Sequence, residues 1–247
     1  MFNDPALFHL HHSHETEDIF FWKRLASRYG GPILELGCGT GRILIPLAEA
    51  GYLITGFDIN FQALVYLKNS LNIALRKNIS IFQSNMDRFH LGIDFSLIFL
   101  ACNTWSTLDS ETRLAALNKI AYHLNPSGIF ATSFPNPAYL EDLPDASEME
   151  IEETLIHPIT GNPVQVISGW ERTNNRMIFR WYYDQLFPDG NVVREKNKTQ
   201  HFLTSLDEYI AEMKAEKLNP IEVLGDYSFS DYEITSPYSI IIARKEN

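Results

Sequence analysis

The chain has 247 residues, of which 45% are hydrophobic, and it carries a formal net charge of -11 at pH 7. This length and apolar content suit one substantial core with an elaboration. The negative charge argues against a large phosphate-binding surface, so we expect no nucleic-acid partner. No apolar run reaches the roughly eighteen residues of a membrane span, and the polar, acidic N-terminus is unlike a secretory signal, so we expect a cytoplasmic protein without a membrane partner.

The N-terminal segment contains four closely spaced histidines, His9, His11, His12 and His14. Imidazoles two residues apart could share one face of an extended segment and bind a metal. No carboxylate or cysteine arrangement accompanies them, so we predict no metal site, and a mobile polar leader is the simpler alternative. Cys38 and Cys102 lie in apolar, strand-like contexts, which predicts reduced thiols instead of a disulfide or a zinc site.

From Pro32 to about Ser133, apolar runs alternate with segments of helical periodicity. This alternation predicts strand–helix units and a parallel sheet. The predicted strands cover residues 33–36, 52–57, 79–83, 95–100 and 129–133. The predicted helices cover residues 43–50, 61–75 and 110–124, and the turn residues Asn125, Pro126 and Gly128 end the last of them.

Residues 148–203 change to a period-two alternation, which predicts an antiparallel β insert. Turn-forming residues at 173–176 and 188–190 predict its tight turns. Ser205 and Glu208 have the spacing of a capping box and predict a helix that runs to about Lys217. The apolar run from Tyr238 to Ala243 is then expected to rejoin the first sheet as its last buried strand.

The segment from Ile33 to Arg42 reads ILELGCGTGR, a strand followed by a glycine-rich turn and the start of a helix. Glycines in such a turn let a cofactor lie against backbone amides at a helix N-terminus. Asp58 ends the next strand about twenty residues later, a spacing that suits a ribose-binding carboxylate. The dinucleotide fingerprint needs glycines at positions one, three and six, whereas here Gly41 is fifth and Arg42 is sixth. A tight connection without any ligand is the structural alternative.

The pattern Glu-x-Gly-x-Gly-x-Gly resembles motif I of class I S-adenosylmethionine-dependent methyltransferases. The resemblance extends from about Asp18 to the C-terminus and is strongest before Ser133. It implies an α/β fold with a Rossmann-like seven-stranded sheet whose last strand is antiparallel, helices on both faces, and an antiparallel β insert after strand five. It divides the chain into an N-terminal helical lid (1–30), an S-adenosylmethionine-binding α/β core (31–147), the β insert (148–204), and a C-terminal helix with closing strands (205–247).

The resemblance implies S-adenosyl-L-methionine as the cofactor, bound at the ends of the first four strands. Asp58 would bond the ribose hydroxyls and Ile59 would pack on the adenine, although Ile59 alone is also explained as core. Relatives often have Gly-Asp-Met where residues 84–86 are Ser-Asn-Met here, so the Asn85 amide would replace an acid and Asp87 competes with it. The implied cofactor-binding residues are Glu35, Gly37, Cys38, Gly39, Gly41, Asp58, Ile59, Asn85, Met86, Ala101 and Asn103.

Methyl transfer from a sulfonium is an in-line displacement, so positioning and exclusion of water are the main tasks and we assign no catalytic residue. The expected acceptor is an amine or hydroxyl of a small molecule. Contacts to it are expected from the lid, the strand ends and the aromatic insert, at Trp22, Trp105, Asn136, Trp170, Arg172, Trp181 and Tyr183. The insert aromatics could instead cover the parent sheet or form a homodimer contact.

Three histidines, His123, His157 and His201, are isolated in the sequence and are expected to be structural or surface residues. Two other functions stay open at this point. One is a nicotinamide-dependent oxidoreductase, and the other is a non-catalytic regulatory protein that binds the cofactor.

Overall fold

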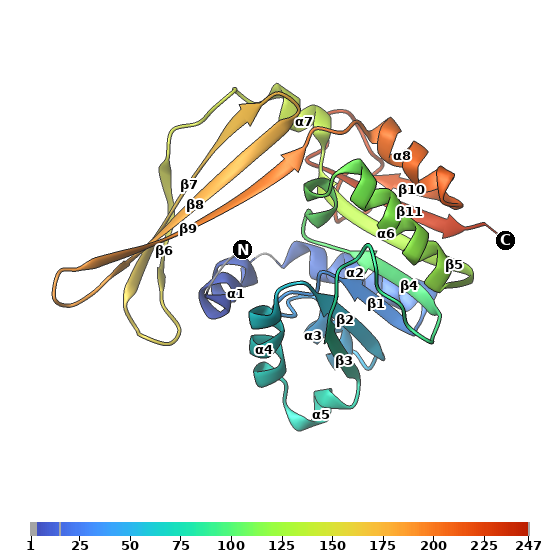
Figure 1. The fold of residues 1–247 in the computed structure, drawn as a ribbon, viewed down its shortest axis with the longest axis horizontal. Coiled ribbons are helices and arrows are strands. Elements are labelled where there is room, and N and C mark those ends of the chain that lie inside the picture. Colours follow the sequence, from blue (N-terminus) through green and yellow to red (C-terminus); the bar gives the residue numbers. More distant parts are fainter. Residues whose placement is uncertain (1–3, 15, 247) are drawn as a thin grey trace.

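A computed structural model describes residues 4–14 and 16–246, which form two β-sheets (Figure 1). The larger sheet has 7 strands in the order β10-β11-β5-β4-β1-β2-β3. Its strands β1 to β5 pair in parallel, and β11 runs antiparallel to both of its neighbours. This order confirms the predicted Rossmann-like sheet with its last strand antiparallel. The strands are β1 (Ile33–Leu36), β2 (Ile54–Asp58), β3 (Ile79–Gln83), β4 (Phe95–Leu100), β5 (Leu124–Pro135), β10 (Leu218–Leu224) and β11 (Tyr238–Lys245).

Helices cover both faces of this sheet, because its strands are apolar on both sides. On one face pack the N-terminal helix α2 (Glu17–Tyr29) and the helices α3 (Leu44–Glu49) and α4 (Phe61–Ser70). On the other face pack α6 (Ser110–His123) and α8 (Leu206–Ala215). None of the helices in the described residues is long and apolar enough to cross a membrane.

Two predicted boundaries are wrong for local reasons. The helix expected over residues 61–75 is interrupted, because Leu71 is extended and the Asn72 side chain accepts from Leu75 N to cap a new helix, α5 (Ile73–Arg76). The strand expected from residue 129 begins at Leu124, which still pairs with Phe95. The turn chemistry of residues 125–128 therefore produces a register shift inside β5 instead of a loop before it.

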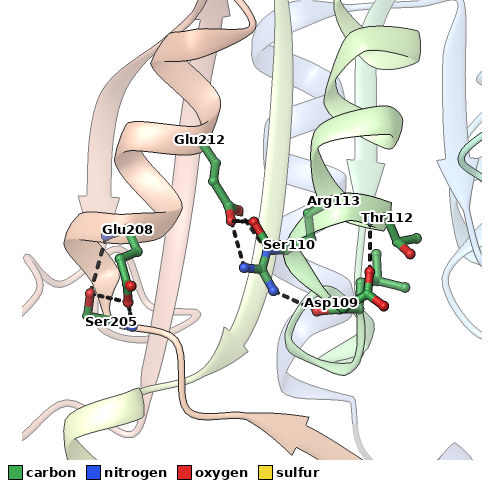
Figure 2. Close-up of polar contacts among 8 residues, drawn as sticks. Asp109, Ser110, Thr112, Arg113, Ser205, Glu208 and Glu212 are labelled. Carbon is green, nitrogen blue, oxygen red and sulfur yellow. Dashed lines mark hydrogen bonds and ion pairs between the residues drawn. The ribbon is translucent and has the colours of Figure 1, made fainter. Parts of the chain in front are cut away.

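The smaller sheet is the expected insert, with strands β6 (Glu150–Ile156), β7 (Pro163–Thr173), β8 (Arg176–Leu186) and β9 (Val192–Phe202) in antiparallel order. The predicted turns between β7 and β8 and between β8 and β9 are both present. A short helix, α7 (Pro137–Asp142), leads from β5 toward the insert, and the 3-10 helix η1 (Thr104–Thr107) follows β4. The capping box of α8 is confirmed, with Ser205 and Glu208 bonded reciprocally (Figure 2).

One face of the insert carries Val164, Val166 and Tyr183, which form a small apolar cluster with Leu7. Leu7 belongs to α1 (Pro5–Ser13), which lies beneath the insert in Figure 1. Helix α1 therefore fills the angle between the insert and the seven-stranded sheet.

A buried ion pair fastens α8, the first element after the insert, to the core (Figure 2). The Arg113 side chain on α6 is 2% exposed, and its Nε and Nη2 donate to the Glu212 carboxylate at 2.7 Å. Its Nη1 donates to Leu108 O at 2.6 Å, and its guanidinium lies 4.8 Å from the centre of the Tyr209 ring. A charge buried this deeply depends on its partners, because it has lost its hydration.

The substitution Glu212→Ala should destabilise the protein by about 3 kcal/mol, because it leaves the Arg113 guanidinium buried without its carboxylate. Glu216→Ala is the control. Among the described residues the Glu216 carboxylate accepts only from the exposed Asn118 amide, so its loss should cost less than about 0.5 kcal/mol. Urea unfolding of both variants measures the difference. Equal losses would show that the buried pair has no special role.

Candidate functional site

The glycine turn follows β1 and is built from backbone conformations that favour glycine. Gly37, Gly39 and Gly41 have φ values of 65°, 51° and 87°. A Cβ on Gly41 would lie 2.4 Å from Leu67 Cδ1, so this glycine permits close packing of the turn on α4. A Cβ on Gly39 would meet only an Asp58 carboxylate oxygen, at 3.9 Å. The turn is therefore packed tightly on its inner side and borders open space at Gly39.

Asp58 holds this turn against the end of β2. Its Oδ2 accepts from Gly39 N at 2.8 Å, and its Oδ1 accepts from Asn60 N at 2.7 Å. Burial raises the pKa of Asp58, and these backbone hydrogen bonds oppose that effect. Next to it, Ile59 is 54% exposed, so the alternative that it is ordinary core is wrong.

The ends of β1, β3 and β4 meet beside the turn. A Cβ on Gly37 would lie 3.9 Å from both Met86 Cε and Thr104 Cγ2. Of the two competing polar side chains after β3, Asp87 is paired with Arg88 at 3.0 Å. The Asn85 side chain makes no hydrogen bond within the described residues, which leaves its amide available to a ligand.

The backbone is strained where β4 ends. Cys102 and Asn103 follow the buried Ala101 and both have φ 60°, a left-handed conformation that non-glycine residues rarely adopt in succession. Such strain costs on the order of 1–3 kcal/mol per residue and persists where surrounding structure enforces it, often at ligand sites. Asn103 Oδ1 is also buried without a hydrogen-bond partner in the described residues.

A buried charged cluster lies around the turn. Arg42 donates from Nη1 and Nη2 to the two Asp18 carboxylate oxygens at 2.7 and 2.6 Å, and from Nη2 to Cys102 Sγ at 2.8 Å. Glu35 is 3% exposed, and its Oε2 has no hydrogen-bond partner among the described residues. Burial raises the pKa of Glu35 well above its ordinary value, and the positive charge of Arg42 opposes this. The site therefore offers a carboxyl oxygen that a cationic donor would satisfy. The neighbouring Cys38 is a buried thiol.

Helix α1 contributes residues that the sequence did not identify as contacts. His9 Nδ1 lies 2.9 Å from Thr40 Oγ1 in the glycine turn, and His11 Nδ1 lies 2.9 Å from Tyr183 Oη in the insert. The alternative of a mobile polar leader is wrong, because α1 is packed through a buried Leu7. Within residues 4–14 and 16–246, no group of three or more His, Cys, Asp or Glu side chains is arranged to hold a metal.

Four of the predicted substrate contacts have structural roles instead. Trp22 and Trp105 are fully buried on opposite faces of the large sheet, stacked on Phe99 and against Phe130 respectively. Large aromatic side chains bury much apolar area, and both of these are enclosed in the core instead of lining a pocket.

Asn136 and Arg172 are engaged in other hydrogen bonds. The Asn136 amide donates to the carbonyls of residues 234 and 236 and accepts from Ala138 N and the Tyr232 hydroxyl. Arg172 Nη2 donates to the carbonyls of residues 140, 141 and 143, at the C-terminal end of α7. Both side chains therefore hold the two ends of α7.

The remaining substrate candidates lie on one face of the insert. Trp170 and Trp181 are half-buried, and the Phe179 ring lies between them with centroid distances of 6.3 and 6.1 Å. Tyr183 continues this face but is buried and bonded to His11, so it joins the insert to α1. A substrate role for Trp170 and Trp181 stays a prediction.

The core of this chain resembles a known protein family. Residues 33–128 match the family model of a methyltransferase domain. This segment is a methyltransferase domain. It contains the glycine turn, Asp58, and the ends of β3 and β4, so the family match covers the candidate site. The nicotinamide alternative is thereby disfavoured, in agreement with Arg42 at the sixth position of the glycine pattern.

Similar proteins share this domain over part of their length. The putative methyltransferase YqeM of Bacillus subtilis (strain 168) is 31% identical over 102 residues, which is 40% of each chain. The cypemycin N-terminal methyltransferase of Streptomyces sp is 28% identical over 110 residues, or 44% of each chain. The matched region thus spans less than half the length of these curated relatives.

Solved structures match the fold over nearly the whole chain. The sugar N-methyltransferase KedS8 from Streptoalloteichus sp ATCC 53650 has a TM-score of 0.81 and 16% identity, covering 100% of this chain and 94% of that one. The CcbJ methyltransferase from Streptomyces caelestis has a TM-score of 0.77 and 18% identity, covering 94% and 90%. The likeness therefore includes the insert and α1 as well as the methyltransferase domain.

The buried Glu35 should make the protein's stability depend on pH. Its folded pKa is raised above the ordinary value of 4.5, so the folded state holds a proton that the unfolded state has released at higher pH. Stability from this group is therefore lost as pH rises above about 4.5. Relative to wild type, Glu35→Gln should gain stability progressively as pH rises.

Urea unfolding of the protein without added ligand at several pH values measures this trend, and Glu141→Gln, which changes an exposed carboxylate, is the matched control. A difference between Glu35→Gln and wild type that does not change with pH would contradict the assignment.

Proposed function

We propose that this protein binds S-adenosylmethionine at the carboxyl ends of β1 to β4 and transfers the methyl group to an amine of a small molecule. The observation that carries the proposal is the glycine turn of the methyltransferase domain, which borders open space at Gly39 beside the Asp58 carboxylate. The glycine turn, Asp58 and the residues that follow β3 and β4 together form a cradle. It lies at the switch point of an open α/β sheet, where such folds bind their ligands.

The polar groups of this cradle fit the cofactor. The unpartnered Glu35 Oε2 would accept from the ammonium of its methionine part, which also explains a carboxyl buried without a donor. Asp58 would bond the ribose hydroxyls, the exposed Ile59 would pack on the adenine, and the Asn85 amide would bond the adenine edge. Cys38, Gly41 and Ala101 would shape the cradle through their backbone.

The chemistry needs orientation more than it needs acid–base groups. When bound, S-adenosylmethionine supplies a methyl group on a sulfonium, which a neutral amine attacks in line. The residues of this chain would hold the two reactants and exclude water. Helix α1 is placed for the second task, since His9 reaches the glycine turn and His11 reaches the insert.

An amine is favoured over a hydroxyl because it can attack without a catalytic base. The names of similar proteins agree: KedS8 is described as a sugar N-methyltransferase and CalS10 as an amino pentose methyltransferase. The acceptor would lie between the strand ends and the aromatic face of the insert, beside Trp170 and Trp181. A homodimer formed through the insert stays a prediction.

Isothermal titration calorimetry should show binding of both S-adenosylmethionine and S-adenosylhomocysteine. Asp58→Ala and Gly39→Val should each weaken it about tenfold to hundredfold. The first removes a charged hydrogen bond, which is worth about 1.5–3 kcal/mol, and the second introduces a side chain at residue 39 that would occupy the cradle. Asp87→Ala should leave binding unchanged and Asn85→Ala should weaken it.

The reverse result for residues 85 and 87 would move the adenine contact to Asp87. If wild-type protein binds neither S-adenosylmethionine nor S-adenosylhomocysteine, the proposal is wrong.

Radiolabelled methyl transfer tests the acceptor class. We expect label in amines from a panel of aminodeoxy sugars, their nucleotide conjugates and short peptides with free N-termini, and none in the corresponding hydroxyl compounds. The rate should rise with pH through the pKa of each amine, because only the neutral amine has a lone pair. Transfer to hydroxyl compounds alone would refute the amine assignment, and cofactor binding without any transfer would favour the regulatory alternative.

A further inference from the structure

A second polar junction joins the insert to the end of β4, apart from the cradle described above. His201 on β9 is 7% exposed, and its Nδ1 lies 2.8 Å from the hydroxyl of the buried Ser106 in η1. The Ser106 hydroxyl also lies 3.0 Å from Asn103 O. Asn103 is one of the two strained residues after β4, so the junction leads directly to the candidate site.

The hydrogen bonds of this junction determine the tautomer of His201. A serine hydroxyl has one proton, and Ser106 donates it to Asn103 O, because a carbonyl can only accept. Ser106 must then accept from His201, which places the imidazole proton on Nδ1. Nε2 is left with a lone pair, and it makes no hydrogen bond to any described residue. Burial lowers the pKa of His201 to about 4, so this neutral form persists at neutral pH.

A comparison with His123 shows that burial alone does not produce an open nitrogen. His123 is also buried, and both of its nitrogens are used: Leu91 N donates to Nε2 at 2.9 Å, and Nδ1 contacts Lys119 O at 2.7 Å. Buried polar atoms are normally satisfied in this way. The Nε2 of His201 is instead accessible to solvent, and no described residue donates to it.

The position of His201 in the insert suits a contact with the acceptor. Met177 lies opposite His201 in the β8–β9 register, and Phe179 and Trp181 follow on the same face at two-residue steps. The Phe179 ring meets the His201 ring edge-on at 5.5 Å. This is the face that packs on α1 at its other end, through Tyr183. His201 therefore stands where the aromatic face of the insert reaches the end of β4.

We propose that His201 Nε2 accepts a hydrogen bond from the N–H of the methyl acceptor, and that Ser106 is a positioning residue that holds the required tautomer. This inference rests on the methyl transfer proposed above and narrows the acceptor to a primary or secondary amine, since a tertiary amine has no N–H. The hydrogen bond orients the nitrogen lone pair toward the methyl group. As the new C–N bond forms, the C–S electron pair goes to sulfur, and the surplus proton on nitrogen leaves to water while His201 stays neutral.

The tautomer can be measured without knowing the acceptor. In protein carrying isotope-labelled histidine, long-range proton–nitrogen NMR should show His201 neutral and protonated on Nδ1 between about pH 5 and 8. His123 is an internal standard for the same tautomer, because the Leu91 N–H donates to its Nε2. Ser106→Ala should release the His201 tautomer and leave His123 unchanged, and Ser106→Thr should restore it. A proton on His201 Nε2 in the wild type would overturn the inference.

Proximity to the reacting methyl group is the second test. With methyl-labelled S-adenosylmethionine bound and no amine added, a nuclear Overhauser effect should connect the methyl group to the His201 ring and not to the His123 ring. If the cofactor binds and no such effect is found, the role of His201 is wrong while the proposed function stands. If calorimetry shows no cofactor binding, the proposed function itself fails.

His201→Asn keeps a donor for Ser106 and removes the acceptor nitrogen. We expect cofactor affinity to stay within about twofold of wild type. The rate of transfer to the primary amines of the panel should fall about hundredfold, which is the loss expected when a reactant is held about 1 Å out of place. Thr199→Val, a nearly isosteric change on the same face of β9, should retain the wild-type rate. Equal losses in both variants would show that only the packing of β9 matters.

Discussion

The hydrogen bond from Gly39 N to the Asp58 carboxylate joins the ends of two neighbouring parallel strands, and the candidate site is built around it. It requires a left-handed backbone at Gly39, and it places a half-buried carboxylate at the edge of an open cradle. The strands themselves are held by apolar clusters on both faces of the sheet. This core holds the strand ends, and with them the candidate site, in place.

This arrangement contains several features that lower stability. Glu35 is buried without a donor, and Cys102 and Asn103 keep a strained backbone. Such features persist only where the surrounding packing enforces them, and proteins concentrate them at functional sites. The bidentate pair between Arg42 and Asp18 lies beside them and anchors α2 to the glycine turn. The proposed cofactor would satisfy the carboxyl that the fold leaves without a partner.

The insert and α1 complete the site from outside the matched methyltransferase domain. Histidines make hydrogen bonds between these parts: His9 contacts the glycine turn, His11 contacts Tyr183, and His201 contacts Ser106. Each joins segments far apart in the sequence. An imidazole suits this task because it can donate from one nitrogen and accept at the other, and the tautomer follows from the partner. The acceptor specificity proposed for this protein thus depends on contacts between elements.

The sequence by itself determined the five parallel strands, the glycine turn with Asp58, and the insert, because these follow from local periodicity, turn chemistry and spacing along the chain. It misjudged Trp105 and Asn136, since burial and hydrogen-bond saturation depend on residues that are distant in sequence. Only the tertiary structure could decide the role of His201, which is unremarkable as an isolated histidine. Its partner Ser106 lies 95 residues away in the sequence, and the Ser106 hydroxyl determines which imidazole nitrogen is available as a hydrogen-bond acceptor.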